Sequence, residues 1–76
     1  MMDELSIFLL NEVKENPNLS AGALTAHVVY KMKPVPKIAD LFWKVEKVLD
    51  NLVKQGKLER IGDTYKEYVN YVEDAG

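Results

Sequence analysis

An amphipathic segment that ends at a glycine constrains the fold of this chain more than any other feature. Its apolar residues recur at the i, i+3, i+4 and i+7 spacing of a helix with one buried side. These residues are Leu41, Phe42, Val45, Val48, Leu49, Leu52 and Val53. Gly56 follows, and glycine adopts the left-handed conformation that ends a helix without a steric penalty. The spacing therefore predicts a helix over about residues 37–55, which stops at Gly56.

The residues after Gly56 have the pattern of a β-hairpin. A turn sequence, Gly62-Asp63-Thr64, separates a short apolar segment from a run rich in tyrosine and valine that ends at Val72. We predict a hairpin over about residues 57–72. Strand alternation would place Tyr65, Val69 and Tyr71 on one side and Tyr68 and Val72 on the other.

Two shorter helices are expected before the amphipathic segment. Asp3 is a suitable N-cap for a helix over about residues 4–15, and Ser20 for a second helix over about residues 21–32. Pro17 separates them because the residue before a proline is disfavoured in helical conformation. The inward side chains would be Leu5, Phe8, Leu9 and Val13 in the first helix, and Leu24, His27, Val28 and Tyr30 in the second. Residues 33–36 then form an extended connection to the third helix.

Composition limits the chain to one small domain. It has 76 residues, of which 47% are apolar, and no cysteine, so neither disulfides nor thiolate-bound zinc supplement the core. No apolar run approaches the length of about 20 residues needed to cross a bilayer. The N-terminal segment is acidic where a signal peptide would be positive. We expect a single domain over residues 1–76, located in the cytoplasm and without a membrane partner.

The order of these features resembles the winged helix-turn-helix superfamily. Residues 9–17 look like the first helix of many bacterial and archaeal winged-helix regulators, including its polar-Asn-Pro break. Leu19-Ser20, followed by Leu24 and Val28, looks like their capped second helix. The pattern leading into the wing is matched by Leu49, Leu52 or Val53, Gly56, Leu58 and Ile61. The resemblance implies a mainly α, α+β fold of three helices with a C-terminal two-stranded wing.

The link between the second and third helices departs from this pattern. The segment from Val28 to Leu49 is about ten residues longer than in a compact helix-turn-helix, whose turn has only three or four residues. Two explanations are open: the second helix is extended, or Pro34–Pro36 belongs to a true loop.

The resemblance also implies a function, a homodimeric transcriptional regulator that binds duplex DNA. In this superfamily the third helix enters the major groove and the wing contacts the backbone or the minor groove. Carried onto this sequence, the helix contacts would be Lys37, Lys44, Lys47 and Asn51, and the wing contacts would be Arg60 and Lys66. The third helix has no arginine, the strongest reader of guanine, and it carries Glu46 and Asp50. The alternative for its lysines is a solvated surface with Lys–Glu pairs.

The net charge of −2 is unevenly distributed along the chain. Residues 1–30 carry one lysine against four acids, and residues 67–76 carry three acids, so each segment has a net charge of −3. Residues 31–66 carry nine Lys and Arg against five acids, a net charge of +4. This positive segment favours nucleic acid as a partner, although a solvated surface with a chance asymmetry has the same pattern.

Trp43 is expected on the polar side of the third helix, beside Lys47 and Asp50. Three roles are open for it: contact with a base, sugar or phosphate backbone, anchorage of a protein partner, or cover by another part of the chain. The tyrosines of the hairpin favour the second role as an alternative function. In that alternative the chain is a protein-interaction module that binds a polymerase, a replication complex or another DNA-bound factor. Its partner-binding residues would be Trp43, Tyr65, Tyr68 and Tyr71.

The sequence offers little for catalysis. His27 is the only histidine and has no cysteine to complete a metal site, so a satisfied, partly buried side chain is expected there. Ser20 is accounted for as a helix cap, and no glycine-rich phosphate loop is present. We expect a protein that is not an enzyme and that needs neither a cofactor nor a metal.

Overall fold

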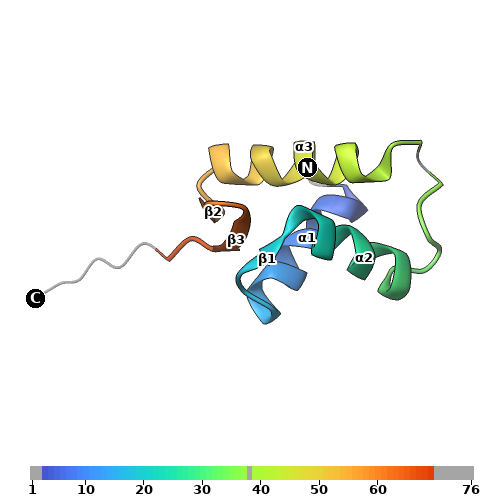
Figure 1. The fold of residues 1–76 in the computed structure, drawn as a ribbon, viewed down its shortest axis with the longest axis horizontal. Coiled ribbons are helices and arrows are strands. Elements are labelled where there is room, and N and C mark those ends of the chain that lie inside the picture. Colours follow the sequence, from blue (N-terminus) through green and yellow to red (C-terminus); the bar gives the residue numbers. More distant parts are fainter. Residues whose placement is uncertain (1–2, 38, 70–76) are drawn as a thin grey trace, which may run out of the picture.

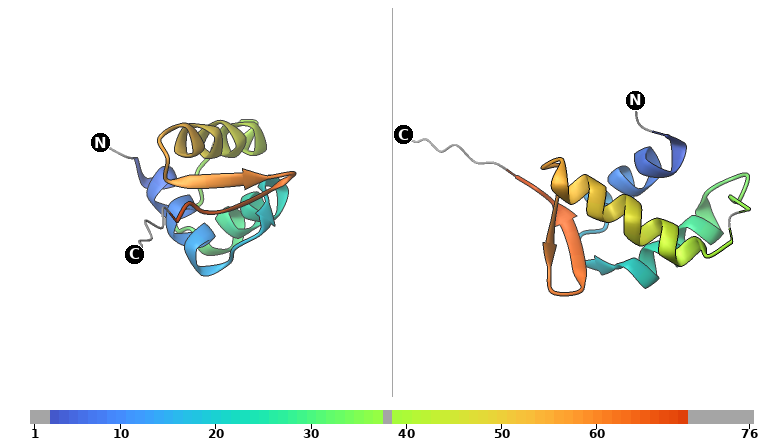
Figure 2. Two further views of the ribbon diagram at one scale, coloured as in Figure 1. Left: turned by 90° about the vertical axis from the view of Figure 1, so that its left-hand side faces the viewer. Right: turned by 90° about the horizontal axis from the view of Figure 1, so that it is seen from above.

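Three helices and a three-stranded antiparallel sheet make up the fold (Figure 1). The computed structural model describes residues 3–37 and 39–69. In chain order the elements are α1 (Glu4–Glu15), β1 (Leu19–Ser20), α2 (Ala21–Lys31), α3 (Leu41–Lys54), β2 (Leu58–Ile61) and β3 (Thr64–Glu67). The two views of Figure 2 show α1 and α2 side by side beneath α3, with the β2–β3 hairpin beside the C-terminal end of α3. The chain is thus a small α+β domain with a C-terminal hairpin, as the sequence predicts.

Both predicted N-caps are confirmed. The Asp3 carboxylate accepts a hydrogen bond of 2.8 Å from the backbone N–H of Ser6, and this bond holds the pKa of Asp3 below its usual value. The Ser20 hydroxyl oxygen accepts one of 3.2 Å from the backbone N–H of Ala23. Each bond satisfies a donor that a helix start leaves unpaired. The caps fix where α1 and α2 begin.

The third helix begins at Leu41, four residues later than predicted. Asp40 has a left-handed backbone with φ of 58°, which excludes it from the helix. Lys37 lies in the connection between α2 and α3, and α2 ends at Lys31. The long link is therefore a loop and not an extension of the second helix. Figure 1 shows that this loop reverses the chain, so that α3 runs back over α2.

The end of α3 at Gly56 is confirmed. Gly56 has φ of 77°, and two hydrogen bonds close the helix end. The backbone N–H of Gly56 donates to the carbonyl of Val53 at 3.0 Å, and that of Lys57 donates to the carbonyl of Leu52 at 2.9 Å. This pair of bonds is the Schellman motif, which needs a left-handed residue at the position of the glycine. The motif turns the chain directly into β2.

The sheet has one strand more than predicted. Its order is β1-β3-β2, and β1 pairs with β3 through Leu19 opposite Tyr65. A strand of two residues is too short to show an alternating pattern, so no sequence pattern predicts it. β3 ends at Glu67, earlier than the predicted hairpin, and the predicted positions of Tyr71 and Val72 lie outside the described residues.

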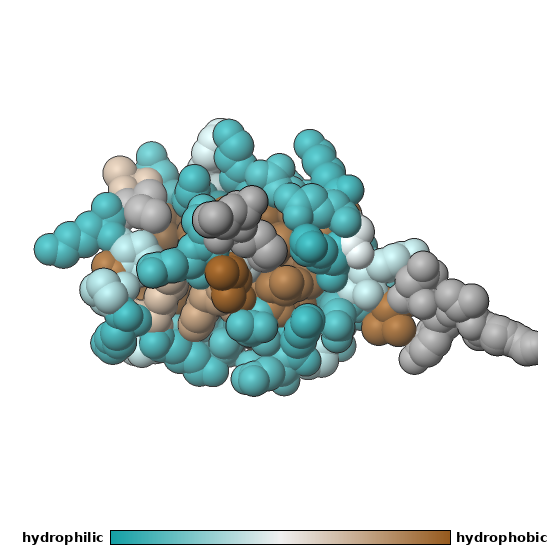
Figure 3. All heavy atoms as spheres, turned by 180° about the vertical axis from the view of Figure 1, so that it is seen from behind, coloured by the Kyte–Doolittle hydropathy of each residue, from teal (hydrophilic) through white to brown (hydrophobic). Residues whose placement is uncertain are grey.

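The core lies where the three helices and the sheet meet. Its fully buried residues are Leu9, Val13, Leu24, Val28, Val45, Leu49, Leu52 and Leu58. Phe8 packs against it and is only partly buried. Two expectations were wrong: Tyr30 and Phe42, both predicted to point inward, are 80% and 46% exposed. Hydrophilic residues cover most of the face seen from behind (Figure 3).

A buried carboxylate joins α1 to α2. Glu12 is 6% exposed, and its Oε2 lies 2.6 Å from both His27 Nδ1 and Lys31 Nζ. Asn16 Nδ2 donates a longer bond of 3.4 Å to the same oxygen. Burial alone raises the pKa of Glu12, but the hydrogen bonds and charges of Lys31 and His27 outweigh it, so that the pKa lies below the usual 4.5. His27 is thus the satisfied, partly buried histidine that the sequence predicts.

Within the described parts of the chain, no helix is both long enough and apolar enough to cross a membrane.

Replacing Glu12 with glutamine is expected to lower the free energy of unfolding at pH 7 by about 1–3 kcal/mol, because the buried site loses charge-assisted hydrogen bonds. The pKa of Glu12 is lowered by folding, so the unfolded chain binds its proton more tightly. The ionised carboxylate therefore stabilises the fold above pH 4.5, and this contribution is lost as the pH falls through the lower folded-state pKa. Urea unfolding of both proteins at several pH values measures the difference, which should narrow below pH 4.5.

The matched control is Glu15→Gln, which removes an exposed carboxylate from the same helix. Its effect should stay within about 0.5 kcal/mol, as for ordinary surface substitutions. A similar loss in both variants would contradict a specific role for Glu12.

Candidate nucleic-acid interface

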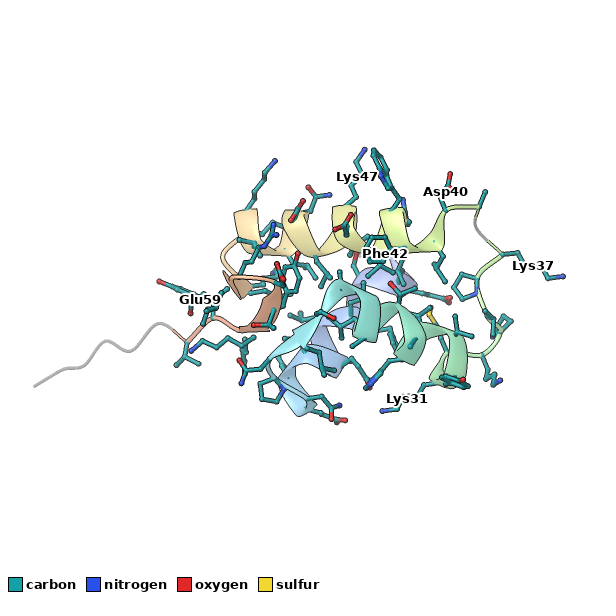
Figure 4. All side chains as sticks on the ribbon, in the orientation of Figure 1. Lys31, Lys37, Asp40, Phe42, Lys47 and Glu59 are labelled. Atoms are coloured by element: carbon teal, nitrogen blue, oxygen red, sulfur yellow. The ribbon has the colours of Figure 1, made fainter. Side chains whose placement is uncertain are left out.

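The outer side of α3 is the most exposed helical surface that carries predicted site residues. Trp43 is 69% exposed, and Lys44, Lys47 and Asn51 are also exposed. Figure 4 shows Lys47 pointing away from the body of the molecule, with Phe42 on the opposite side of the helix, toward α2. Four of the seven predicted nucleic-acid contacts thus lie on the accessible part of one helix.

Trp43 lies beside two carboxylates and one lysine. A shallow hollow on α3 is lined by Trp43, Glu46, Lys47 and Asp50. With 69% of its surface exposed, Trp43 is not covered by any other part of the chain that the structure describes, which disfavours one of the three roles considered for it. The carboxylates repel phosphate, so contact with the backbone at this point depends on Lys47.

Lys44 does not lie on the side of α3 that faces the hairpin. It lines a hollow with Asp3 and Glu4, at the start of α1. Glu46 lines a hollow with residues of the hairpin, and two residues along a helix are about 200° apart. A ligand that reaches the hairpin over Glu46 therefore does not reach Lys44 at the same time.

Arg60 is held by the residues around it. Its Nε donates a hydrogen bond of 2.9 Å to the carbonyl oxygen of Gly62, and its guanidinium carbon lies 5.8 Å from the centre of the Tyr65 ring. Its Nη1 lies 4.0 Å from Asp50 Oδ1 on α3. Because the guanidinium also faces Asp50, part of its positive charge is compensated.

Lys66 and Arg60 lie on opposite faces of the sheet. In the β2–β3 register Arg60 is opposite Tyr65, and Glu59 is opposite Lys66. Cross-strand partners share a face, and consecutive residues alternate between faces. Lys66 Nζ lies 4.0 Å from Glu59 Oε1. The two predicted wing contacts are therefore separated and cannot grip one phosphate together.

The hairpin tyrosines do not form one surface. Tyr65 is 3% exposed and belongs to the core, and its burial raises the pKa of its hydroxyl group. Tyr65 is therefore not available to a partner, which corrects the predicted set. Tyr68 is 46% exposed, and Tyr71 lies outside the described residues. Val69 is 52% exposed and lies beyond the end of β3, so the predicted strand alternation does not extend to it.

A groove between α2, α3 and the hairpin was not predicted. It is lined by Ser20, Ala21, Gly22, Phe42, Glu46, Arg60, Asp63 and Tyr65. A Cβ atom added to Gly22 would lie 4.0 Å from Cε1 of the Phe42 ring, so this ring approaches the start of α2. The only sequence signal was a glycine within the predicted second helix, whereas Phe42 was assigned to the core.

Within residues 3–37 and 39–69, no three His, Cys, Asp or Glu side chains lie close enough together to hold a metal ion.

Replacing Trp43 with alanine is expected to change the free energy of unfolding by no more than about 0.5 kcal/mol, because the side chain is exposed. The matched variant Leu49→Ala removes a fully buried side chain of the same helix and should cost about 2–5 kcal/mol. Urea unfolding followed by circular dichroism measures both, and comparable losses would contradict the exposure of Trp43.

The arrangement of three helices followed by a small antiparallel hairpin is compatible with a winged-helix-like topology. No family model, no curated protein and no solved structure matches this chain.

Proposed function

We propose that this protein binds duplex DNA through the outer side of α3 and the β2–β3 hairpin. The observation that carries the proposal is the uncovered outer side of α3, which exposes Trp43, Lys47 and Asn51 beside a hairpin at the end of the same helix. A helix of this kind fits the major groove, and an adjacent β-hairpin reaches the neighbouring backbone.

The charges favour phosphate contact over base reading. Lys47 and Lys54 are exposed on α3, and each lysine contributes a phosphate contact that carries little sequence information. The helix has no arginine for bidentate contact with guanine, whereas Glu46 and Asp50 repel the backbone. We therefore propose moderate affinity, strong dependence on salt and weak discrimination between sequences.

Replacing Lys47 with alanine is expected to weaken binding of a mixed-sequence duplex. One lost phosphate contact should reduce the slope of log K against log salt concentration by about 0.9. The measurement is a titration of Trp43 fluorescence, the only tryptophan in the chain, with duplex DNA at about 50 and 200 mM salt.

The control variant is Lys14→Ala, which removes the same charge from α1, where Lys14 lies 3.9 Å from Glu67. It should leave the salt slope unchanged. A folded wild-type protein that gives no signal at the lower salt concentration would contradict the DNA-binding proposal.

The second candidate is a protein-interaction module centred on Trp43. It is supported by the exposure of this large side chain next to Glu46 and Asp50, an environment that suits a basic partner better than phosphate. Tryptophan is a favoured anchor in protein interfaces because it buries a large area with few rotatable bonds. Tyr68 at the end of the hairpin is the other exposed aromatic of this candidate surface.

If this candidate is correct, Trp43→Ala should abolish capture of a protein partner from a nuclease-treated cell extract, while the variant remains folded. The matched control is Tyr30→Ala, which removes an exposed aromatic from α2. Equal capture by wild type and Trp43→Ala would rule out a partner anchored by Trp43, whereas loss of capture on nuclease treatment alone would indicate DNA-mediated recovery.

The proposal extends to the biological setting. We take the protein to be a cytoplasmic transcriptional regulator that acts as a homodimer and has no enzymatic activity. These parts depend on the sequence, in particular on the resemblance to winged-helix regulators and on a single histidine without cysteine.

A further inference from the structure

One side of α2 is exposed and uncharged. From Ala21 to Tyr30 the helix contains no Asp, Glu, Lys or Arg. Gly22, Ala26, Val29 and Tyr30 are exposed, and the two larger side chains are 43% and 80% accessible. Surface helices of small domains normally carry charge on the side that faces water. An exposed apolar area on a helix without charges indicates a surface that another molecule covers.

Phe42 extends this surface onto α3. The Phe42 ring is 46% exposed and lies beside Gly22, since a Cβ atom built on Gly22 would be 4.0 Å from its Cε1 atom. We call the combined area the α2 face. It consists of Gly22, Ala23, Ala26, Val29 and Tyr30 on α2, and Phe42 on α3.

The glycine in this face is not required by the chain itself. The nearest atoms to a Cβ at Gly22 would be at 3.9 and 4.0 Å, which is ordinary van der Waals contact, and its φ is not positive. Alanine also favours a helix over glycine. The space around Gly22 would therefore accept an alanine, and the glycine leaves a flat area that another chain can approach closely.

We propose that the α2 face binds a second copy of this chain, with the two α2 helices antiparallel and related by a two-fold axis at Ala26. The order of side-chain sizes along the helix supports a self-complementary contact. Gly22 and Ala23 are small, and Val29 and Tyr30 are large. An antiparallel pairing about Ala26 places Tyr30 of each copy over Gly22 of the other, and Val29 opposite Ala23.

The groove at the start of α2 receives the large side chain. It has a volume of about 270 Å³ and is lined by Gly22 and Phe42, together with the charged side chains of Glu46, Asp63 and Arg60. Tyr30 of the second copy would stack on the exposed Phe42 ring, and its hydroxyl group would meet a carboxylate. Aromatic pairs of this kind contribute beyond the area they bury.

Residues of opposite charge flank the two ends of the uncharged α2 face. Lys33 is exposed just beyond the C-terminal end of α2. Near its N-terminal end the carboxylates of Glu46 and Asp63 outnumber one cation, Arg60, which also faces Asp50. The antiparallel pairing brings Lys33 of each copy toward these carboxylates of the other copy, so the two-fold axis generates two such contacts. A parallel pairing would place like charges together, so the charges select the antiparallel arrangement.

The symmetry places both α3 helices on one side of the dimer. In an antiparallel helix pair the two-fold axis is perpendicular to the helices and lies within the interface. In this dimer the two-fold axis is parallel to the direction from α2 to α3, and Figure 1 shows α3 above α2. Rotation by 180° about this axis leaves both α3 helices above the paired α2 helices. Two copies of Trp43 and Lys47 would then face the same duplex. Dimer formation is tested in the absence of DNA, so a failure of the dimer proposal can be distinguished from a failure of the DNA-binding proposal.

Sedimentation equilibrium over a wide concentration range tests the pairing. Wild type should approach twice the 8.7 kDa mass of one chain. Tyr30→Glu should remain at the mass of one chain at the same concentrations, and circular dichroism should show it folded because Tyr30 is 80% exposed. The control Ile7→Glu places a carboxylate on an exposed apolar position of α1 and should leave the dimer intact. A wild type that stays at one chain, or a Tyr30→Glu variant that still dimerises, would overturn the proposal.

Charge exchange tests the antiparallel register. Lys33→Glu and Asp63→Lys should each raise the dissociation constant of the dimer by about threefold. Each variant replaces an attraction between exposed opposite charges with a repulsion, and the two-fold axis repeats this change at both ends of the interface. The double variant should return it toward the wild-type value. Additive weakening in the double variant would overturn the register.

A cysteine at the two-fold axis gives a readout that does not depend on affinity. The chain has no cysteine, so Ala26→Cys introduces one thiol per copy. Close approach of its two Cα atoms, within about 7 Å, allows a disulfide bond. Two thiols are oxidised to the disulfide as oxidised glutathione is reduced to two thiols. Ala26→Cys should form a linked dimer much faster than Asn11→Cys on the exposed side of α1, and equal rates would overturn the pairing.

Discussion

Burial of one side of α3 is the interaction on which the rest of the structure depends. Val45, Leu49 and Leu52 lie among the residues of α1, α2 and the sheet, and are at most 2% exposed. A chain of 76 residues can sustain only one small core, so this helix has no second apolar side to bury. Its opposite side remains in water with Trp43 and Lys47. The force that forms the fold therefore also creates the candidate interface.

Two sets of polar interactions determine the positions of the elements around α3. The Schellman motif at Gly56 sets the direction in which the chain enters β2, and this places the hairpin beside the end of α3. Glu12 joins α1 to α2 from within the partly buried contact between them, where His27 and Lys31 satisfy its charge. An unpaired carboxylate at that position would be costly, so the network also selects the relative placement of the two helices.

Local signals in the sequence predict the elements of this fold, whereas the contacts between elements are not predicted. Asp3 and Gly56 act through hydrogen bonds within a few residues, so their effects can be read from the sequence alone. β1 exists because Leu19 meets β3 more than forty residues later, and no local pattern contains that pairing. Helical periodicity places Phe42 at the edge of the buried arc, but only the neighbouring helix decides whether it is covered. The burial of Glu12 was also not predictable from local sequence, since its partners His27 and Lys31 lie on another helix.

The two exposed helical surfaces differ in the ligand chemistry they favour. The outer side of α3 mixes lysines with Glu46 and Asp50, and a surface with both signs of charge remains soluble without being covered. The α2 face has no charge and exposes aromatic and branched side chains, so the water around it is released when a second surface covers it. Covering the α2 face leaves Trp43 and Lys47 accessible, because neither lines the groove that receives Tyr30, whereas Glu46 lies between the two surfaces. A dimer of this kind doubles the number of lysines that face one duplex. The free energies of the phosphate contacts add, so two sets of lysines strengthen DNA binding more than one set. This gain is relevant to a chain with a net charge of −2.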